Sequence, residues 1–159
     1  MKAKTSPTPI KIAMLLSATL LVACTGTRPV DIGVSDNRLT PCPDSPNCVS
    51  SFEPQSDETH YISAYLIKGD NQQQTWASLK SLIEQNSSAE IIKQDEQYIY
   101  AEYTSSIMRF VDDAEFLLDK ENNSVQLRSA SRLGYKDFGV NRERLEAIRT
   151  ELQSQDLVK

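Results

Sequence analysis

Cys24 is the residue whose surroundings most clearly indicate a chemical reaction. It ends the run Leu21-Val22-Ala23-Cys24, which follows an uncharged, mostly apolar stretch that begins at Ile12. A cysteine thiol accepts a diacylglyceryl group, and a small residue before it admits the peptidase that then cleaves the precursor. The run resembles the lipidation signal of bacterial lipoproteins. We therefore predict a signal peptide over 1–23 and a mature chain that begins at Cys24 and carries fatty acyl chains such as palmitate.

The residues on either side of the apolar stretch agree with this prediction. Lys2, Lys4 and Lys11 give it a basic start, and its length suits a signal peptide but is too short to span a bilayer as a helix. The alternative is an ordinary secretory signal that leaves Cys24 as a free thiol, but such signals favour a small residue where Leu21 stands. Thr25 is not the aspartate that often retains lipoproteins at the inner membrane. We expect a location at the outer membrane, facing the periplasm.

Charge and length limit what the mature chain can do. Without the three lysines of the signal it carries 14 basic and 22 acidic residues, a net charge of −8. This balance argues against nucleic acid as a partner, because binding phosphates requires clustered Lys and Arg. We expect a lipidated tether over 24–40 and a single globular domain over 41–159.

The two other cysteines, Cys42 and Cys48, lie in a loop with three prolines. An even pair in an oxidising compartment favours a structural disulfide. A redox pair is more often C-x-x-C at a helix start, and zinc would need two more ligands although His60 is the only histidine. We expect neither a metal nor a cofactor.

Few residues of the sequence are suited to catalysis. His60 lies in a polar stretch without an evident partner, so a Ser-His-Asp or Cys-His system has no basis. Asp112 and Asp113 are adjacent and point to opposite faces of a strand, whereas Asp113 and Glu115 share a face. We assign no catalytic residue. The alternative that stays open is a hydrolase or transferase whose acid and base are carboxylates of this region.

The elements that position these residues follow from periodicity. We expect strands at 61–68, 90–93, 97–103, 109–119 and 124–132, a tight turn at Asn122-Asn123, and helices over 71–86 and from Asn141 to about 154. Asp70 and Asn141 are the expected helix N-caps. The order β-α-β-β-β-β-α predicts an α+β fold, with an antiparallel sheet of about five strands and two helices packed on one face.

Three segments resemble the bacterial family called domain of unknown function 1499. They are 42–51 (CPDSPNCVSS), 109–116 (RFVDDAEF) and 128–144 (RSASRLGYKDFGVNRER), and together they span the predicted domain. One departure is Asn37, where the family is expected to have glycine; asparagine also tolerates a left-handed turn. The resemblance implies a shared fold and an envelope setting, and it supplies no reaction.

The third segment is basic within an acidic chain. Residues 128–149 hold six basic and three acidic residues, and Arg128 and Arg132 share a strand face. One interpretation is an anion site built from arginines and helix N–H groups. The other is a structural lattice of ion pairs with the acidic residues. The candidates for either role are Arg109, Asp112, Asp113, Arg128, Arg132, Tyr135, Asp137, Asn141, Arg142 and Arg144.

These observations favour a non-enzymatic envelope lipoprotein that binds or scaffolds. Its expected partners are the membrane, through the anchor on Cys24, and an anionic small molecule, a lipid head group or an envelope protein. A pocket with a carboxylate that no arginine matches would favour the enzyme. Carboxylates that are all paired would favour binding or scaffolding.

Overall fold

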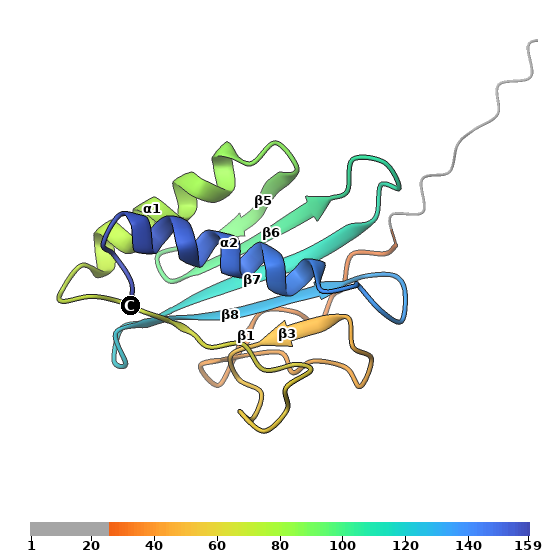
Figure 1. The fold of residues 1–159 in the computed structure, drawn as a ribbon, viewed down its shortest axis with the longest axis horizontal. Coiled ribbons are helices and arrows are strands. Elements are labelled where there is room, and N and C mark those ends of the chain that lie inside the picture. The colour runs from red at the N-terminus through yellow and green to blue at the C-terminus, as the bar shows by residue number, and fades with distance from the viewer. Residues whose placement is uncertain (1–25) are drawn as a thin grey trace, which may run out of the picture.

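The computed structural model of the protein describes residues 26–159, so the predicted signal peptide and Cys24 lie outside the described residues. The described chain forms a twisted antiparallel sheet with two helices against it (Figure 1). Its elements are β1 (Val34–Ser35), β2 (Arg38–Leu39), β3 (Cys48–Ser50), β4 (Tyr65–Leu66), α1 (Gln72–Gln85), β5 (Ala89–Gln94), β6 (Tyr98–Thr104), β7 (Val111–Asp119), β8 (Ser124–Ser131) and α2 (Val140–Ser154).

The main sheet has six strands, of which five follow the order β3-β8-β7-β6-β5, while β4 also pairs with β8. Every pairing between these strands is antiparallel. The longest ladder joins β7 to β8, from Asp112 opposite Ser131 to Asp119 opposite Ser124. Strands β1 and β2 form a separate small hairpin.

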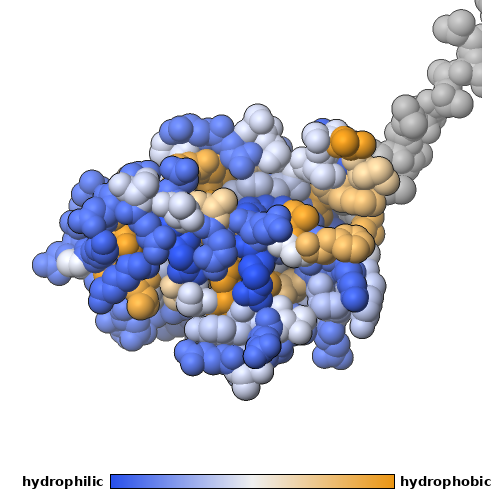
Figure 2. Space-filling view, in the orientation of Figure 1, coloured by the Kyte–Doolittle hydropathy of each residue, from blue (hydrophilic) through white to orange (hydrophobic). Residues whose placement is uncertain are grey.

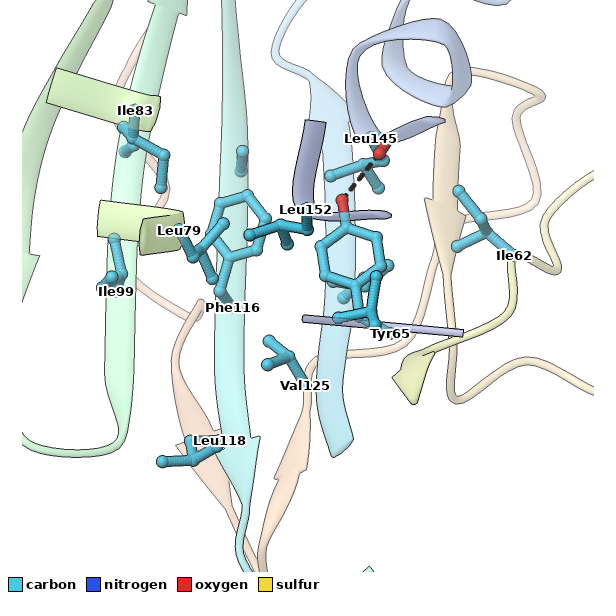
Figure 3. Close-up of a cluster of buried hydrophobic side chains, with 14 of the residues drawn as sticks. Ile62, Tyr65, Leu79, Ile83, Ile99, Phe116, Leu118, Val125, Leu145 and Leu152 are labelled. Carbon is cyan, nitrogen blue, oxygen red and sulfur yellow. Dashed lines mark hydrogen bonds between the residues drawn. The ribbon is translucent and has the colours of Figure 1, made fainter. Parts of the chain in front are cut away.

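Both helices cover one face of the sheet, where the main core lies (Figure 3). Leu79 and Ile83 of α1 and Leu145 and Leu152 of α2 are buried against strand residues such as Phe116. Helical residues that recur every three or four positions line up along the side that packs on the sheet. Neither helix of residues 26–159 is long and apolar enough to cross a membrane.

The predicted α+β class, with an antiparallel sheet and two helices on one face, is confirmed. Two details differ. The short strand β3 was not expected, because the prolines around the cysteines hide its extended backbone. The strand expected over 61–68 is reduced to Tyr65–Leu66, beside single bridges at Tyr61 and Ile67.

The helix caps also differ from the expectation. Helix α1 is preceded by Asn71 rather than Asp70, and its cap makes no side-chain hydrogen bond. Helix α2 is preceded by Gly139 in the left-handed conformation, and Asn141 lies inside the helix and is fully buried. Glycine takes that conformation without steric cost, so Gly139 and not Asn141 occupies the N-cap position.

The second face of the sheet is covered by the amino-terminal segment, defined here as residues 26–43. Leu39 packs there against Tyr98, Tyr100 and Leu117 in a smaller apolar cluster. We expected residues 24–40 to be a tether, and the structure differs: its described part lies across the sheet. The strands β6 and β7 are buried on both faces, so both faces need a cover.

Candidate functional site

Charged side chains from three strands meet beneath the amino-terminal segment. Asp113 and Glu115 of β7 point to this face, as do Arg128 of β8 and Arg132 just after it. Glu102 of β6 joins them. Alternation along each strand brings these groups together, because residues two apart share a face and the ladder sets neighbouring strands in register.

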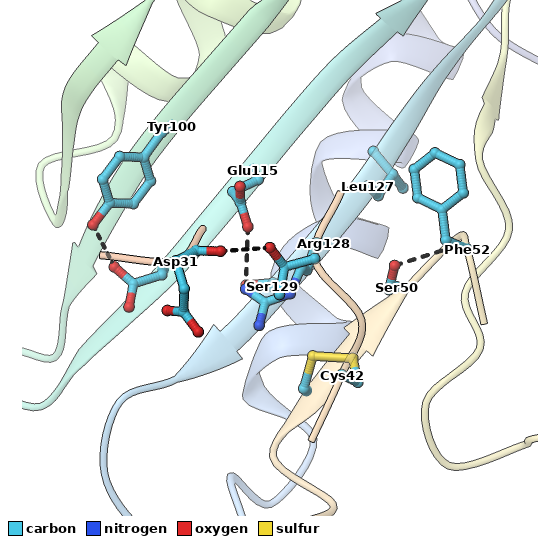
Figure 4. Close-up of polar contacts among 12 residues, drawn as sticks. Asp31, Cys42, Ser50, Phe52, Tyr100, Glu115, Leu127, Arg128 and Ser129 are labelled. Carbon is cyan, nitrogen blue, oxygen red and sulfur yellow. Dashed lines mark hydrogen bonds and ion pairs between the residues drawn. A yellow bond between two sulfur atoms is a disulfide. The ribbon is translucent and has the colours of Figure 1, made fainter. Parts of the chain in front are cut away.

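Arg132 is the centre of this network, with its side chain only 6% exposed. Its Nε donates to both carboxylate oxygens of Asp113, at 3.1 and 2.9 Å, and its Nη2 donates to Asp113, to Glu102 and to the Tyr100 hydroxyl. The Tyr100 hydroxyl in turn donates to Asp113 at 2.6 Å (Figure 4). Arg28 of the amino-terminal segment closes the network on Glu102.

Glu115 forms a second, deeper pair with Arg128 (Figure 4). The Glu115 side chain is fully buried. It accepts hydrogen bonds from the Tyr98 hydroxyl at 2.7 Å and from Arg128 Nη1 at 3.1 Å. Burial raises the pKa of Glu115, although the hydrogen bond from Tyr98 and the charge of Arg128 oppose that rise. Arg128 Nε is buried and has no hydrogen-bond partner within the described part of the chain.

Asp112 faces the helices and has a partner of its own. Arg144 of α2 donates to Asp112 at 2.6 Å, and its guanidinium stacks on Tyr103 with 4.5 Å to the ring centroid. Arg144 also donates to the Asn141 side chain, which is bonded to Ser129. The two adjacent aspartates therefore serve opposite faces of the sheet.

The other nominated residues lie elsewhere. Arg109 is exposed in the β6–β7 loop, and Tyr135 is exposed in the β8–α2 loop. Arg142 donates to the backbone carbonyls of Glu58 and Thr59. Asp137 accepts from the backbone N–H groups of Gly139 and Asn141, so it caps the start of α2. The structure thus does not gather the whole set into one site.

Two cavities border these groups. One, of about 600 Å³, lies beside α2 and contains the pair Asp112–Arg144. The carboxylates of Glu143 and Glu151 also border it, but both side chains are exposed on the helix. The other, of about 340 Å³, lies between the amino-terminal segment and the sheet and is lined by Asp113, Arg128 and Arg132, among others. In both cavities the buried carboxylates are matched by arginine.

The predicted disulfide between Cys42 and Cys48 is present, with the Cα atoms 5.6 Å apart. It joins the amino-terminal segment to β3 and so holds the cover on the sheet. Within residues 26–159 no group of three or more His, Cys, Asp or Glu side chains is placed to hold a metal ion.

His60 has a partner that the sequence did not reveal. Its Nδ1 lies 2.8 Å from Asp57 Oδ2, and its Nε2 lies 3.3 Å from the Ser45 carbonyl oxygen. The hydrogen bond to Asp57 raises the pKa of His60. Because Nε2 faces a backbone carbonyl and not a hydroxyl or thiol, the pair does not activate a nucleophile.

Sequence reasoning missed four members of the network: Arg28, Tyr98, Tyr100 and Glu102. Three of them alternate along β6, so period two already placed them on one face. What the sequence lacked was the knowledge that this face is buried. Arg28 carries no local signal, since it belongs to an irregular segment.

Glu102 should make stability depend on pH in the acid range. Burial alone would raise the pKa of Glu102, but hydrogen bonds from Arg28, Arg132 and Tyr100 outweigh it and lower the pKa to about 2. A carboxyl with a depressed pKa stabilises the fold above its unfolded value of about 4.5 and loses that contribution as the pH falls through its folded pKa. We expect a loss of roughly 1–2 kcal/mol from this group, since solvent still reaches the side chain.

Urea unfolding of the natural protein and of Glu102→Gln, from pH 6 to pH 2, measures this contribution. The difference between the two proteins should shrink as the pH falls below about 4.5. Glu121→Gln, in the exposed β7–β8 turn, is the matched control and should leave the pH profile unchanged. A difference that stays constant with pH would contradict the assignment to Glu102.

Comparison with known proteins assigns the family. The family model described as "Protein of unknown function (DUF1499)" matches residues 38–152. No curated protein and no solved structure matches the chain. The matched region holds the main sheet, nearly all of α2 and, apart from Arg28, the network of ion pairs around Arg132. This chain belongs to the DUF1499 family of proteins of unknown function.

Proposed function

We propose that this protein is a lipid-anchored domain of the bacterial envelope that acts by binding or scaffolding and not by catalysis. The observation that supports binding or scaffolding over catalysis is the pairing of carboxylates with arginines. Asp112, Asp113 and Glu115, the carboxylates of the region on which the enzymatic alternative depends, each bond an arginine. A carboxylate held in this way is a poor proton donor or acceptor, because proton transfer would leave a buried charge without its partner.

The first half of the proposal rests on Leu21-Val22-Ala23-Cys24 and the apolar stretch before it. The disulfide agrees with an oxidising compartment outside the cytoplasm. Thr25 after the cysteine favours the outer membrane, on the side that faces the periplasm. Two or more acyl chains on Cys24 would hold the protein there essentially permanently.

The ligand in this proposal is anionic or is an envelope protein. Of the arginines in the nominated set, Arg128, Arg132 and Arg144 bond carboxylates, which favours the structural interpretation of the lattice. Arg109 bonds no other side chain within residues 26–159 and lies exposed in its loop. An anionic partner would therefore meet the protein at the β6–β7 loop and not inside the network.

The test is to purify the full-length protein from its native envelope and to measure the intact mass of the processed chain. We expect a chain that begins at Cys24 and carries the mass of a diacylglyceryl group and an amide-linked acyl chain. Mass spectrometry of the same preparation identifies lipid or protein that co-purifies. Cys24→Ser is the matched control and should abolish both the added mass and membrane retention. An unmodified amino terminus upstream of residue 24 would overturn the anchoring.

A further inference from the structure

One end of the molecule exposes more large apolar side chains than a soluble surface usually does. They belong to two loops, residues 105–110 between β6 and β7 and residues 132–139 between β8 and α2. Their exposed fractions reach 88% for Ile107 and 91% for Phe138. We call the set the end patch: Ile107, Met108, Phe110, Leu133, Tyr135 and Phe138.

The two loops lie side by side because they leave neighbouring strand ends. Asp112, near the start of β7, is opposite Ser131 at the end of β8, and Arg132 N–H donates to the Val111 carbonyl. In Figure 2 hydrophobic side chains gather at this end of the molecule, whereas most of the rest of the visible face is hydrophilic. Large exposed apolar patches mark surfaces that contact a protein or a membrane.

Both loops are held in shape by hydrogen bonds near their bases. Ser105 N–H donates to the Phe110 carbonyl, and the Asn47 side chain donates to the Gly134 carbonyl at 2.7 Å. The apolar tips therefore project from fixed backbones. Such an arrangement costs little conformational entropy when the tips enter another phase.

The described chain begins at this same end. A Cβ placed on Gly26 would lie 3.0 Å from Arg132 Cβ and 3.2 Å from Leu133 Cγ, so Gly26 is packed against the end patch. Cys24 is two residues earlier, and two residues span at most about 7 Å. An acylated Cys24 would therefore bring the lipid surface to the patch, with no room for a spacer.

The charges of the two loops suit an anionic lipid surface. Arg109 and Lys136 lie in the loops, and the acidic residue there, Asp137, is bonded to backbone N–H groups of α2. These loops are basic although the mature chain carries a net charge of −8. Basic side chains among exposed apolar ones are typical of protein surfaces that lie in the membrane interface.

We propose that the end patch inserts into the phospholipid bilayer that carries the anchor, so that the domain stands on the membrane in one fixed orientation. The proposal rests on the proposed lipidation of Cys24. The occupant is a bilayer and not a second copy of the chain, because the anchor site is only two residues from Gly26, which packs against the patch. The amino-terminal segment then lies directly against the membrane and does not act as a spacer between the membrane and the domain.

The test uses the full-length, lipidated protein reconstituted into vesicles of phosphatidylethanolamine and phosphatidylglycerol that contain brominated phosphatidylcholine. Phe138→Trp is made in a Trp76→Phe background, so that the probe is the sole tryptophan. We expect brominated lipid to quench its fluorescence by about half or more, since interfacial side chains reach the acyl boundary. Leu66→Trp in the same background is the matched control, because Leu66 is also exposed but lies opposite Ser124, at the other end of β8. It should not be quenched.

Three results would overturn the proposal. One is equal absence of quenching at both positions in protein that floats with the vesicles. Another is equal quenching at both, which indicates no fixed orientation. The third is a probe at 138 that is shielded from iodide but not quenched by brominated lipid, which indicates contact between two copies. Tyr135→Trp replaces the first probe if that variant fails to fold.

The intact mass of the same preparation separates this proposal from the proposed function. A lipidated chain whose probe is not quenched would support the anchor and contradict insertion of the end patch. A chain that carries no lipid would contradict the anchoring. In that chain, quenching at position 138 would still support insertion of the end patch, and an absence of quenching would overturn the insertion.

Discussion

Replacing Arg132 by methionine should lower the free energy of unfolding by about 3–5 kcal/mol, the usual loss when one partner of a buried ion pair is removed. Asp113 and Glu102 would then share the single hydroxyl proton of Tyr100, and only Glu102 would keep an arginine, the exposed Arg28. The two carboxylates, joined through one tyrosine hydroxyl, would then repel each other in a buried place. Urea unfolding at neutral pH, followed by circular dichroism, measures the change.

Arg109→Met is the control for this prediction, because it removes the same charge from an exposed loop position. We expect a change within about 0.5 kcal/mol, as for most surface substitutions. If Arg132 served a ligand instead of the fold, both variants would unfold at the same urea concentration as the natural protein. That result would return the network to the anion-site interpretation.

The sequence carried enough information to place these residues on the correct faces of β7 and β8. A two-residue turn at Asn122-Asn123 would place Glu121 opposite Ser124, whereas the observed turn spans residues 120–123 and places Asp119 opposite Ser124. The register therefore differs by two residues from the expected one, and a shift of two leaves every side chain on its expected face. Alternation of side chains assigns the two aspartates to opposite faces, as the structure shows.

Periodicity could not predict that the amino-terminal segment covers the second face of the sheet. Residues 26–43 contain glycines and prolines and form only the two-residue strands β1 and β2. A segment held by a few apolar contacts, one ion pair and a disulfide has no repeating pattern. Its composition is that of a tether. Its contacts depend on the folded sheet and could not be predicted from the segment alone.

Asn141 shows how a residue can be found for the wrong reason. It was nominated as a helix N-cap, but its side chain is buried and makes four hydrogen bonds. Its Oδ1 accepts from Ser129 and Arg144, both at 2.6 Å, and its Nδ2 donates to the Asn47 carbonyl and to Ser131. An amide that joins β8, α2 and the loop before β3 matters more than a cap.

Asn141→Ala should therefore lower the free energy of unfolding by about 3 kcal/mol, since it leaves several buried polar groups without partners and opens a small void. Asp137→Ala tests the capping role separately. Asp137 accepts from the N–H groups of Gly139 and Asn141, and loss of a cap costs about 1 kcal/mol. Urea unfolding of both variants gives the two values. Equal losses would mean that Asn141 contributes no more than a cap, and the buried amide would then not be what joins α2 to the sheet.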